Sequence, residues 1–293
     1  MLQMVNKILY GIIALFTVTG CNNLDIKGLL FPVSTGVEKR FSQSMDLTGN
    51  KTSSSIETED EYMFYVCTDP HVDVRTANID TFINALQNDD DASFGIILGD
   101  CTDRRNNMDT YMKAVSYSEE RHEHRHNIFH ILGNHDIYFD GWEEFRNLLG
   151  PSVYCFESKF SSGSDLFICL DSANGTLGHK QTEWLRSLLE RNRSRYRHCF
   201  ILTHTNIFYT DNSQVSSGNM PLEETFALLR LFRTHNVSLV LQGHDHYRED
   251  LFHDNVRYTV VGAISEKVKE PEYLKIKVSP EGMAYEWIQL NRQ

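Results

Sequence analysis

The segment IFHILGNHD, Ile128–Asp136, carries an apolar run directly into a glycine, an amide, an imidazole and a carboxylate. Polar residues that follow a strand commonly form a solvated turn. At the mouth of a sheet, the same residues bind ligands or transfer protons. The other strand ends of the chain decide between these two interpretations.

Four further apolar runs end in the same kind of polar group. In each of them Asp, His or Asn follows the run within three residues. In open α/β sheets, ligands bind at the carboxyl ends of the strands. One such junction alone is usually a turn, but five together predict a site that gathers their side chains. The five junctions are FYVC–TDPH (64–71), GIIL–GDCTDR (95–104), IFHIL–GNHD (128–136), CFIL–THTN (199–206) and LVL–QGHDH (239–246).

The polar residues of these junctions are donor types found in metal sites. Without a cation, so many carboxylates and imidazoles in one place would lose hydration and repel one another at a heavy cost. A divalent ion removes that cost, and we expect two. Nitrogen and oxygen donors without thiolates favour zinc, manganese or iron over calcium. The candidates are Asp69, His71, Asp100, Asp103, Asn134, His135, His204, His244 and His246.

Short apolar runs alternate with amphipathic segments from Tyr62 onward, which predicts a layered α/β fold with mixed sheets. Strands are expected at 63–67, 94–98, 127–132, 166–170, 199–202, 238–241, 258–261, 273–278 and 284–288. Helices are expected at 78–88, 108–120, 142–149, 179–192 and 222–234.

Taken in order, the five polar groups resemble the calcineurin-like metallophosphoesterase superfamily. They read DPH (69–71), GDCTDR (99–104), GNHD (133–136), TH (203–204) and GHDH (243–246), and the resemblance covers roughly Tyr62 to the C-terminus. It implies an α/β sandwich of two mixed β-sheets flanked by α-helices. It also implies hydrolysis of phosphomonoesters or phosphodiesters by a metal-activated hydroxide. Asp103 stands where purple acid phosphatases have a metal-bound tyrosine, so the phosphodiesterase-like branch is the more similar one.

The resemblance also implies which residues hold two divalent ions, with manganese, iron and zinc left open as their identity. The first ion would be held by Asp69, His71 and His246, and the second by Asn134, His204 and His244, with Asp100 bridging the two. A bridging ligand has to be anionic and to offer two oxygens. A neutral amide oxygen in the set limits the build-up of negative charge.

Three further roles follow from the same resemblance. His135 would face the substrate as a general acid, a role that contributes about 10²–10⁴-fold to the rate. Asp103 would orient its imidazole, and Arg104 corresponds to a phosphate-binding arginine. Asp136 is interpreted as a structural residue of the turn, and Asp171 either lines the pocket or is structural. Around GNHD, Tyr138, Phe139 and Trp142 either form an apolar wall beside the metals or pack in the core.

The first residues are typical of an export signal. Lys7 precedes an apolar run, 8–18, that is shorter than the roughly 20 residues a membrane-spanning helix needs. The run ends in VTGC, which resembles a bacterial lipoprotein signal with Cys21 as the lipidated residue. We therefore expect a signal peptide at 1–20, a tether or N-terminal arm at 21–58 and the metallophosphoesterase domain at 59–293. Apolar residues of 31–47 also allow the arm to pack on the domain.

These features predict an exported protein of the bacterial cell envelope, lipid-anchored on the periplasmic or surface side. The expected partners are a small phosphoester substrate and, through Cys21, the membrane. The net charge of −12 and the lack of a basic stripe argue against general nucleic-acid binding. The five cysteines other than Cys21 lie mostly in apolar runs without paired spacing, so we expect buried thiols.

Two other functions compete with phosphoester hydrolysis. The first is a non-catalytic surface lipoprotein that keeps the metal site for binding or stability. His135 argues against it, because a structural site has no need of an imidazole that does not bind the metal. The second is a metal-dependent hydrolase of another bond such as an amide, which an aspartate-bridged ligand set with GNHD disfavours.

Overall fold

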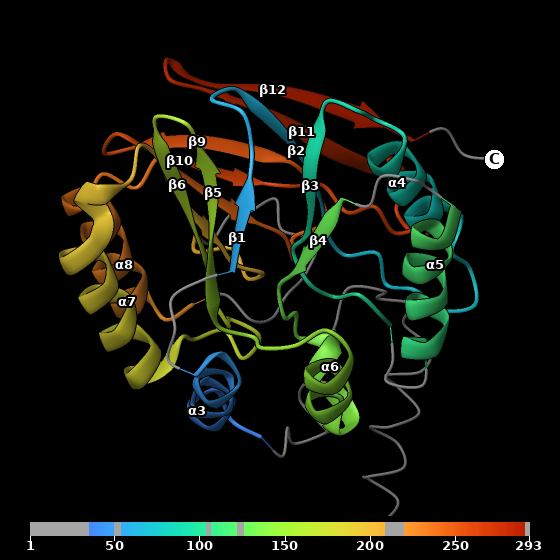
Figure 1. Cartoon of the computed structure of the whole chain (residues 1–293). Helices are drawn as coiled ribbons and strands as arrows, with labels where there is room; N and C mark the ends of the chain where they lie inside the picture. Colours follow the sequence, from blue (N-terminus) through green and yellow to red (C-terminus); the bar gives the residue numbers. More distant parts are fainter. Residues whose placement is uncertain (1–34, 50–53, 104–106, 122–125, 209–219, 291–293) are drawn as a thin grey trace, which may run out of the picture.

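Two β-sheets pack face to face, and helices cover the outer face of each sheet (Figure 1). The computed structural model describes residues 35–49, 54–103, 107–121, 126–208 and 220–290. Both sheets contain parallel and antiparallel strands, so the predicted sandwich of two mixed sheets is confirmed. Among the described residues, no helix is long and apolar enough to span a bilayer.

The five-stranded sheet has the order β12-β11-β2-β3-β4. Its strands are β2 (Tyr62–Cys67), β3 (Ala92–Ile97), β4 (Asn127–His130), β11 (Glu272–Ser279) and β12 (Gly282–Gln289). The first three run parallel, whereas β11 is antiparallel to both β2 and β12. The carboxyl ends of β2, β3 and β4 therefore meet at one edge of the sheet.

The seven-stranded sheet has the order β1-β5-β6-β7-β8-β10-β9. Its strands are β1 (Ser54–Glu57), β5 (Tyr154–Phe160), β6 (Gly163–Cys169), β7 (Cys199–Leu202), β8 (Leu239–Gln242), β9 (Glu249–His253) and β10 (Val256–Val260). Strands β6, β7, β8 and β10 are parallel. The central strands β7 and β8 are buried at every position, which explains why CFIL and LVL are continuous apolar runs.

A stack of phenylalanines fills the space between the sheets. Phe64 and Phe94 come from the five-stranded sheet, and Phe156, Phe167 and Phe200 come from the seven-stranded one. The rings of Phe94 and Phe167 meet across the interface at a centroid distance of 5.3 Å. All five side chains are fully buried, and each contributes about 1.5–3 kcal/mol by leaving water.

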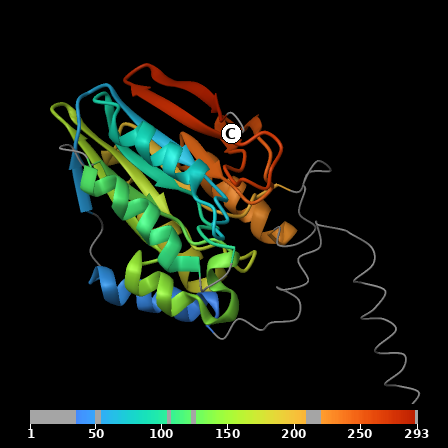
Figure 2. The same ribbon diagram turned by 90° about the vertical axis from the view of Figure 1, so that its right-hand side faces the viewer.

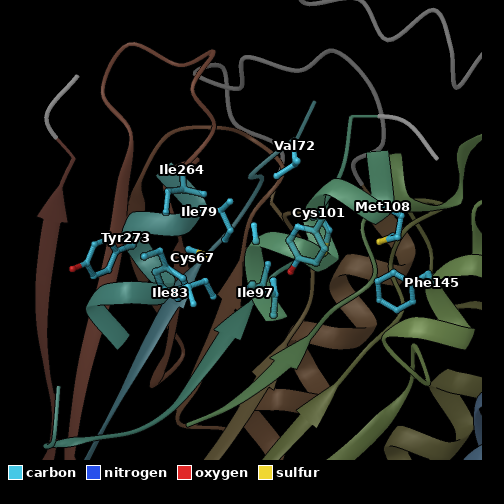
Figure 3. Close-up of a cluster of buried hydrophobic side chains, with 14 of the residues drawn as sticks. Cys67, Val72, Ile79, Ile83, Ile97, Cys101, Met108, Phe145, Ile264 and Tyr273 are labelled. Atoms are coloured by element: carbon cyan, nitrogen blue, oxygen red, sulfur yellow. The ribbon is translucent and has the colours of Figure 1, made fainter. Parts of the chain in front are cut away.

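Helices close the outer faces of the sandwich (Figure 1). Helices α4 (Ala77–Gln87), α5 (Met108–Arg121) and α6 (Trp142–Leu148) share a core with the five-stranded sheet. Figure 3 shows this core, in which Ile79 and Ile83 of α4 lie beside Cys67 and Ile97 of the strands. Helices α7 (Gly178–Asn192) and α8 (Leu222–Thr234) cover the seven-stranded sheet. The described residues also form two short 3₁₀ helices, η2 (His135–Asp140) and η3 (Arg193–Arg195).

Part of the predicted N-terminal arm is ordered and packs on the domain. Helix α3 (Val37–Thr48) lies beside α6 in two perpendicular views (Figures 1 and 2), and Trp142 Nε1 of α6 donates a 2.7 Å hydrogen bond to Gln43 Oε1 of α3. Glu38 accepts hydrogen bonds from the first backbone amides of α7, at 2.5 Å from His179 N. Strand β1 also precedes residue 59, and it pairs with β5. The two segments before the predicted boundary are therefore continuous with the fold of the domain.

The five cysteines within the described residues are buried and unpaired, as expected from their apolar surroundings. They are Cys67, Cys101, Cys155, Cys169 and Cys199. Burial raises the pKa of the Cys67 thiol well above its usual range. Such thiols are packing residues and not reactive ones. Cys21, the predicted lipidation site, lies outside the described residues.

Candidate metal centre

The predicted site residues of the five junctions lie at the carboxyl ends of parallel strands from both sheets. Three junctions follow β2, β3 and β4, and two follow β7 and β8. The two sheets therefore bring their polar ends together at one edge of the sandwich. Seven of the side chains form two neighbouring groups, described in turn below.

The first group consists of Asp69, His71 and His246, whose donor atoms lie within 4.8 Å of one another. The Nε2 atoms of His71 and His246 are 3.1 Å apart. Asp69 Oδ1 is 3.3 Å from His246 Nε2 and 3.6 Å from His71 Nε2. Asp69 Oδ2 accepts hydrogen bonds from Thr68 Oγ1 and from His244 N. The buried Oδ1 accepts none from the described residues, so one oxygen is fixed by the protein and the other is left for a cation.

The second group consists of Asp100, His204 and His244, with Asn134 beside them. His204 Nε2 is 3.2 Å from His244 Nδ1 and 3.0 Å from Asn134 Oδ1. His204 Nδ1 donates to the Leu98 carbonyl at 2.8 Å, which fixes the tautomer and points Nε2 into the group. The Asn134 amide nitrogen donates to the Tyr138 hydroxyl at 2.9 Å, which turns its oxygen the same way.

Asp100 lies between the two groups. Its Oδ2 atom is 3.5 Å from His71 Nε2 of the first group and 3.5 Å from His204 Nε2 of the second. Its Oδ1 atom accepts a 2.8 Å hydrogen bond from His135 N. A single carboxylate therefore borders both sets of donors.

The backbone at the site is held in an unusual conformation. Five of the seven residues have positive φ, namely Asp69 (51°), His71 (44°), Asp100 (51°), His244 (73°) and His246 (63°). Residues other than glycine rarely adopt this region, and where they do the strain is commonly tied to function. The surrounding fold therefore holds these five residues in a backbone conformation that they would otherwise avoid.

Glycines let the two sheets approach closely here. Gly99 has φ of +102°, and a Cβ atom on it would lie 2.8 Å from both Gly133 N and His204 Nδ1. A Cβ atom on Gly133 would lie 2.1 Å from Asp100 Oδ1. Any side chain at either position would displace a predicted ligand.

Burial and the mutual charges of the site shift its pKa values in opposite directions. Burial alone would raise the pKa of Asp69, but His246 and His71 hold it well below its usual range. Burial opposes protonation of His204, yet the Asp100 and Asp69 carboxylates raise its pKa to about 10. Burial, together with His135, lowers the pKa of His71 to about 4. The two carboxylates are thus strongly anionic and stabilise a positive charge between them.

This donor set fits divalent metal ions. Two donors at about 2.0–2.1 Å from one zinc-sized ion lie about 2.9–3.3 Å apart, for angles between 90° and tetrahedral. The imidazole and amide spacings of 3.0–3.2 Å fall in this range. Imidazole and carboxylate donors without thiolate suit zinc, manganese or iron. The buried Asp69 Oδ1, which accepts no hydrogen bond from the described residues, supplies an anionic oxygen for such an ion.

Residues 62–248, which are more than half of the chain, match the sequence profile of the calcineurin-like phosphoesterase family. The chain belongs to this family. The predicted resemblance is thereby confirmed, and the chain is placed among the metal-dependent phosphoesterases. No curated protein sequence matches it.

Solved structures share the fold of this family member. A dimetal phosphatase from Danio rerio has a TM-score of 0.57 at 12% identity, over 78% of this chain and 99% of the fish protein. Purple acid phosphatase PPD1 from yellow lupin (Lupinus luteus) has a TM-score of 0.60 at 13% identity, over 79% of this chain and 52% of the lupin protein. GAP50, the anchor in the inner membrane complex of Plasmodium, has a TM-score of 0.57 at 16% identity, over 78% and 84% of the two chains. At these identities the likeness is one of fold.

His135 lies beside the first group and close to Asp103. Its ring is 4.5 Å from that of His71, centroid to centroid. His135 Nδ1 is 3.4 Å from the main-chain oxygen of Asp103, and a carboxylate oxygen of Asp103 lies within 4.8 Å of a ring nitrogen of His135. The orienting role of the Asp103 carboxylate stays a prediction. The Asp103 carboxylate forms an ion pair with Lys267 Nζ at 3.0 Å, because the ammonium carries a full charge that attracts it. Arg104, the predicted phosphate-binding residue, lies outside the described residues.

Asp136 takes the structural role that the sequence favoured. Its carboxylate accepts hydrogen bonds from Gly133 N at 2.9 Å and Thr102 N at 3.4 Å, and it is buried. Burial and the nearby Asp100 raise the pKa of Asp136 to about 8. Its oxygens are thus used to close the GNHD turn against the strand end that bears Asp100.

Asp171 and the aromatic residues after GNHD divide between core and surface. Asp171 is fully buried and binds the Arg40 guanidinium through both oxygens at 2.8 Å, so it is structural and does not line the site. Tyr138 and Trp142 are buried, which leaves Phe139, 40% exposed, as the member of the three that faces solvent. The apolar wall is therefore mainly core packing.

Ser172 is a supporting residue that the sequence reading missed. Its hydroxyl accepts hydrogen bonds from His204 N at 3.2 Å and Thr205 N at 2.9 Å, and so holds the loop that carries a predicted ligand. The signal was present, because FICL–DS is a sixth apolar run that ends in polar residues. A serine hydroxyl is not a typical metal ligand, so this junction does not stand out among the five that carry Asp, His and Asn.

Proposed function

We propose that this chain is a dinuclear-metal phosphoesterase that hydrolyses phosphomonoesters or phosphodiesters. The position of Asp100 carries this proposal, because one oxygen atom lies at the same 3.5 Å distance from an imidazole of each group. That arrangement suits a carboxylate that bridges two ions. The family match and the nitrogen and oxygen donors support the same conclusion.

In this proposal each group holds one divalent ion, of manganese, iron or zinc. Asp69, His71 and His246 hold the first, Asn134, His204 and His244 hold the second, and Asp100 is shared. When bound there, two such ions would clamp the phosphoryl group and would supply a hydroxide nucleophile near neutral pH. The neutral Asn134 amide keeps the site from accumulating excess negative charge.

His135 serves as the general acid in this proposal. Its backbone amide is held by Asp100 Oδ1, and its ring packs between His71 and Tyr138 at centroid distances of 4.5 and 4.9 Å. With Nδ1 directed at the Asp103 main-chain oxygen, Nε2 is the ring nitrogen that delivers a proton to the leaving oxygen. The half-buried position places the imidazole beside the metal ligands and still within reach of a substrate.

Substitution of His135 by alanine tests this function. We expect kcat on aryl phosphomonoesters and phosphodiesters to fall by about 10²–10⁴-fold, because a positioned general acid contributes that much. Metal content should stay unchanged, since His135 is outside the proposed ligand set. His179→Ala is the matched control, because this imidazole is 79% exposed on α7 and should leave kcat intact. The measurements are steady-state kinetics on a panel of phosphoesters, carboxylic esters and amides, with metal analysis of each preparation.

The panel separates the proposed function from its competitors. Wild-type protein that binds metal but turns over no phosphoester would be a binding protein with this fold. Turnover of amides in preference to phosphoesters would assign another hydrolase activity. Either result would end the proposal.

We also propose that the protein is exported and anchored through a lipid on Cys21. The support is the N-terminal sequence, in which a short apolar run ends in VTGC. Expressed in a bacterium, the wild type should incorporate a labelled fatty acid and sediment with membranes, and Cys21→Ser should lose both properties. Equal labelling of the two proteins would refute the anchor.

A further inference from the structure

Lys267 lies next to the candidate metal centre, although no sequence motif singles it out. It belongs to the loop 261–271 between β10 and β11. Its Nζ atom is 3.0 Å from Asp103 Oδ1, and the Asp103 carboxylate lies within 4.8 Å of a ring nitrogen of both His71 and His135. One carboxylate therefore separates this ammonium from the proposed acid and from a proposed ligand.

The contacts of Lys267 leave it able to bind a further anion. Its second acidic neighbour, Asp73 Oδ2, is 4.0 Å away and is held more closely by Arg75 Nη2 at 2.8 Å. An ammonium has three N–H donors, and the close contact with Asp103 uses one of them. The Lys267 side chain is 41% exposed, so its head group also faces water. A phosphoryl oxygen can replace that water while the pair with Asp103 stays intact.

The charge around the site favours such a cation. Asp73, Asp103 and Glu266 surround this part of the rim, and the whole chain has a net charge of −12. An anionic substrate is repelled by these carboxylates as it approaches. The Arg75 guanidinium is already engaged by Asp73, through Nε at 3.2 Å and Nη2 at 2.8 Å, and has Glu266 at 3.9 Å. Of these two cations, Lys267 has fewer close contacts with carboxylates.

We propose that Lys267 binds a non-bridging phosphoryl oxygen of the substrate and makes the site prefer dianionic phosphomonoesters over monoanionic phosphodiesters. This inference rests on the proposed phosphoesterase function and names its substrate class. The residue acts on substrate binding and not on the proton transfer by His135.

The size of the effect follows from the charge of the substrate. A pair at a partly exposed site changes affinity by up to about fivefold per unit charge. Coulomb energy is proportional to charge, so the factor for a dianion is about the square, roughly 25-fold. Phosphomonoesters are dianions at pH 8 because their second pKa is about 6.

Lys267→Gln tests the proposal with p-nitrophenyl phosphate and bis(p-nitrophenyl) phosphate, which share a leaving group. At pH 8 and constant ionic strength, KM should rise about 25-fold for the monoester and about fivefold for the diester. We expect kcat to stay within about twofold, since the binding is equal in ground and transition states. Lys267→Arg should restore most of the monoester affinity. Lys269→Gln removes the same charge from an exposed position of the same loop and should change neither KM.

Calorimetric titration of metal-loaded protein with inorganic phosphate provides a readout that needs no turnover. Affinity should fall in Lys267→Gln and not in Lys269→Gln, with metal content equal in both. Equal loss on the two substrates, or an equal effect of Lys269→Gln, would overturn the role of Lys267. If the wild type hydrolysed neither substrate, the proposed function would fail, and the phosphate titration would still decide whether Lys267 binds the anion.

Discussion

Replacing Asp100 by asparagine is expected to lower kcat/KM for phosphoesters by at least about 10⁴-fold. Asp100 Oδ2 is 3.5 Å from an imidazole of each group, so the substitution removes the anion that we propose bridges two cations. Loss of the ions removes both the nucleophile and the stabilisation of the phosphoryl charge, and each is worth several kcal/mol. Metal analysis should show fewer than two bound ions per chain.

A chelator should produce the same loss in the wild type, and added manganese should reverse it. Asp90→Asn is the matched control. This carboxylate is exposed in the turn after α4, so the substitution makes the same chemical change away from the site. An Asp100→Asn enzyme that bound two ions and retained more than about a tenth of wild-type turnover would contradict the bridging role. Far-ultraviolet circular dichroism identifies any variant that has simply failed to fold.

Replacing Arg40 by methionine is expected to lower the free energy of unfolding by about 3–5 kcal/mol. The Arg40 guanidinium is completely buried, and its Nε and Nη2 atoms each lie 2.8 Å from an oxygen of Asp171. Its Nη1 atom donates to the Thr35 carbonyl at 2.5 Å. Removing one partner of a buried pair leaves an uncompensated charge, and that accounts for the large cost. Urea unfolding of the purified protein measures the change.

Lys39→Met supplies the control for this experiment. It removes a positive charge from an exposed position of the same helix and should change stability by less than about 0.5 kcal/mol. If Arg40→Met unfolded at the same urea concentration as Lys39→Met, α3 would not be anchored by this pair. The expected result would show that the segment before residue 59 is an integral part of the folded domain.

The class of chemistry was predictable because it depends on residues that are close together in the sequence. Each group of ligand types directly follows an apolar run, and parallel strands leave their carboxyl ends at a common edge. Helix α8 was predicted with the bounds it has in the structure, since Pro221 marks its start and its apolar spacing is regular. The family and the two mixed sheets followed from these same features and are confirmed.

Strands β1, β5 and β9 and helix α3 were not predicted from the sequence. Strand β5 lies inside the seven-stranded sheet, but its sequence YCFESKF interrupts the apolar run with Glu157, Ser158 and Lys159. Strand β1 and strand β9 are largely exposed, so their residues lack the apolar run that marks a buried strand. Helix α3 was hidden for a different reason. Its buried positions include an arginine and a serine, Arg40 and Ser44, and polar residues in a core are not recognised by a hydrophobic pattern.

The sequence by itself determined which residue types stand at the ends of which strands, and hence the class of chemistry. Only the tertiary structure decided which side chains meet. Arg40 and Asp171 are 131 positions apart, and Lys267 contacts Asp103 from a loop that comes much later in the sequence. The physical reason is that strand ends are set by local periodicity, whereas partners across the sandwich depend on strand order and on the packing of the two sheets.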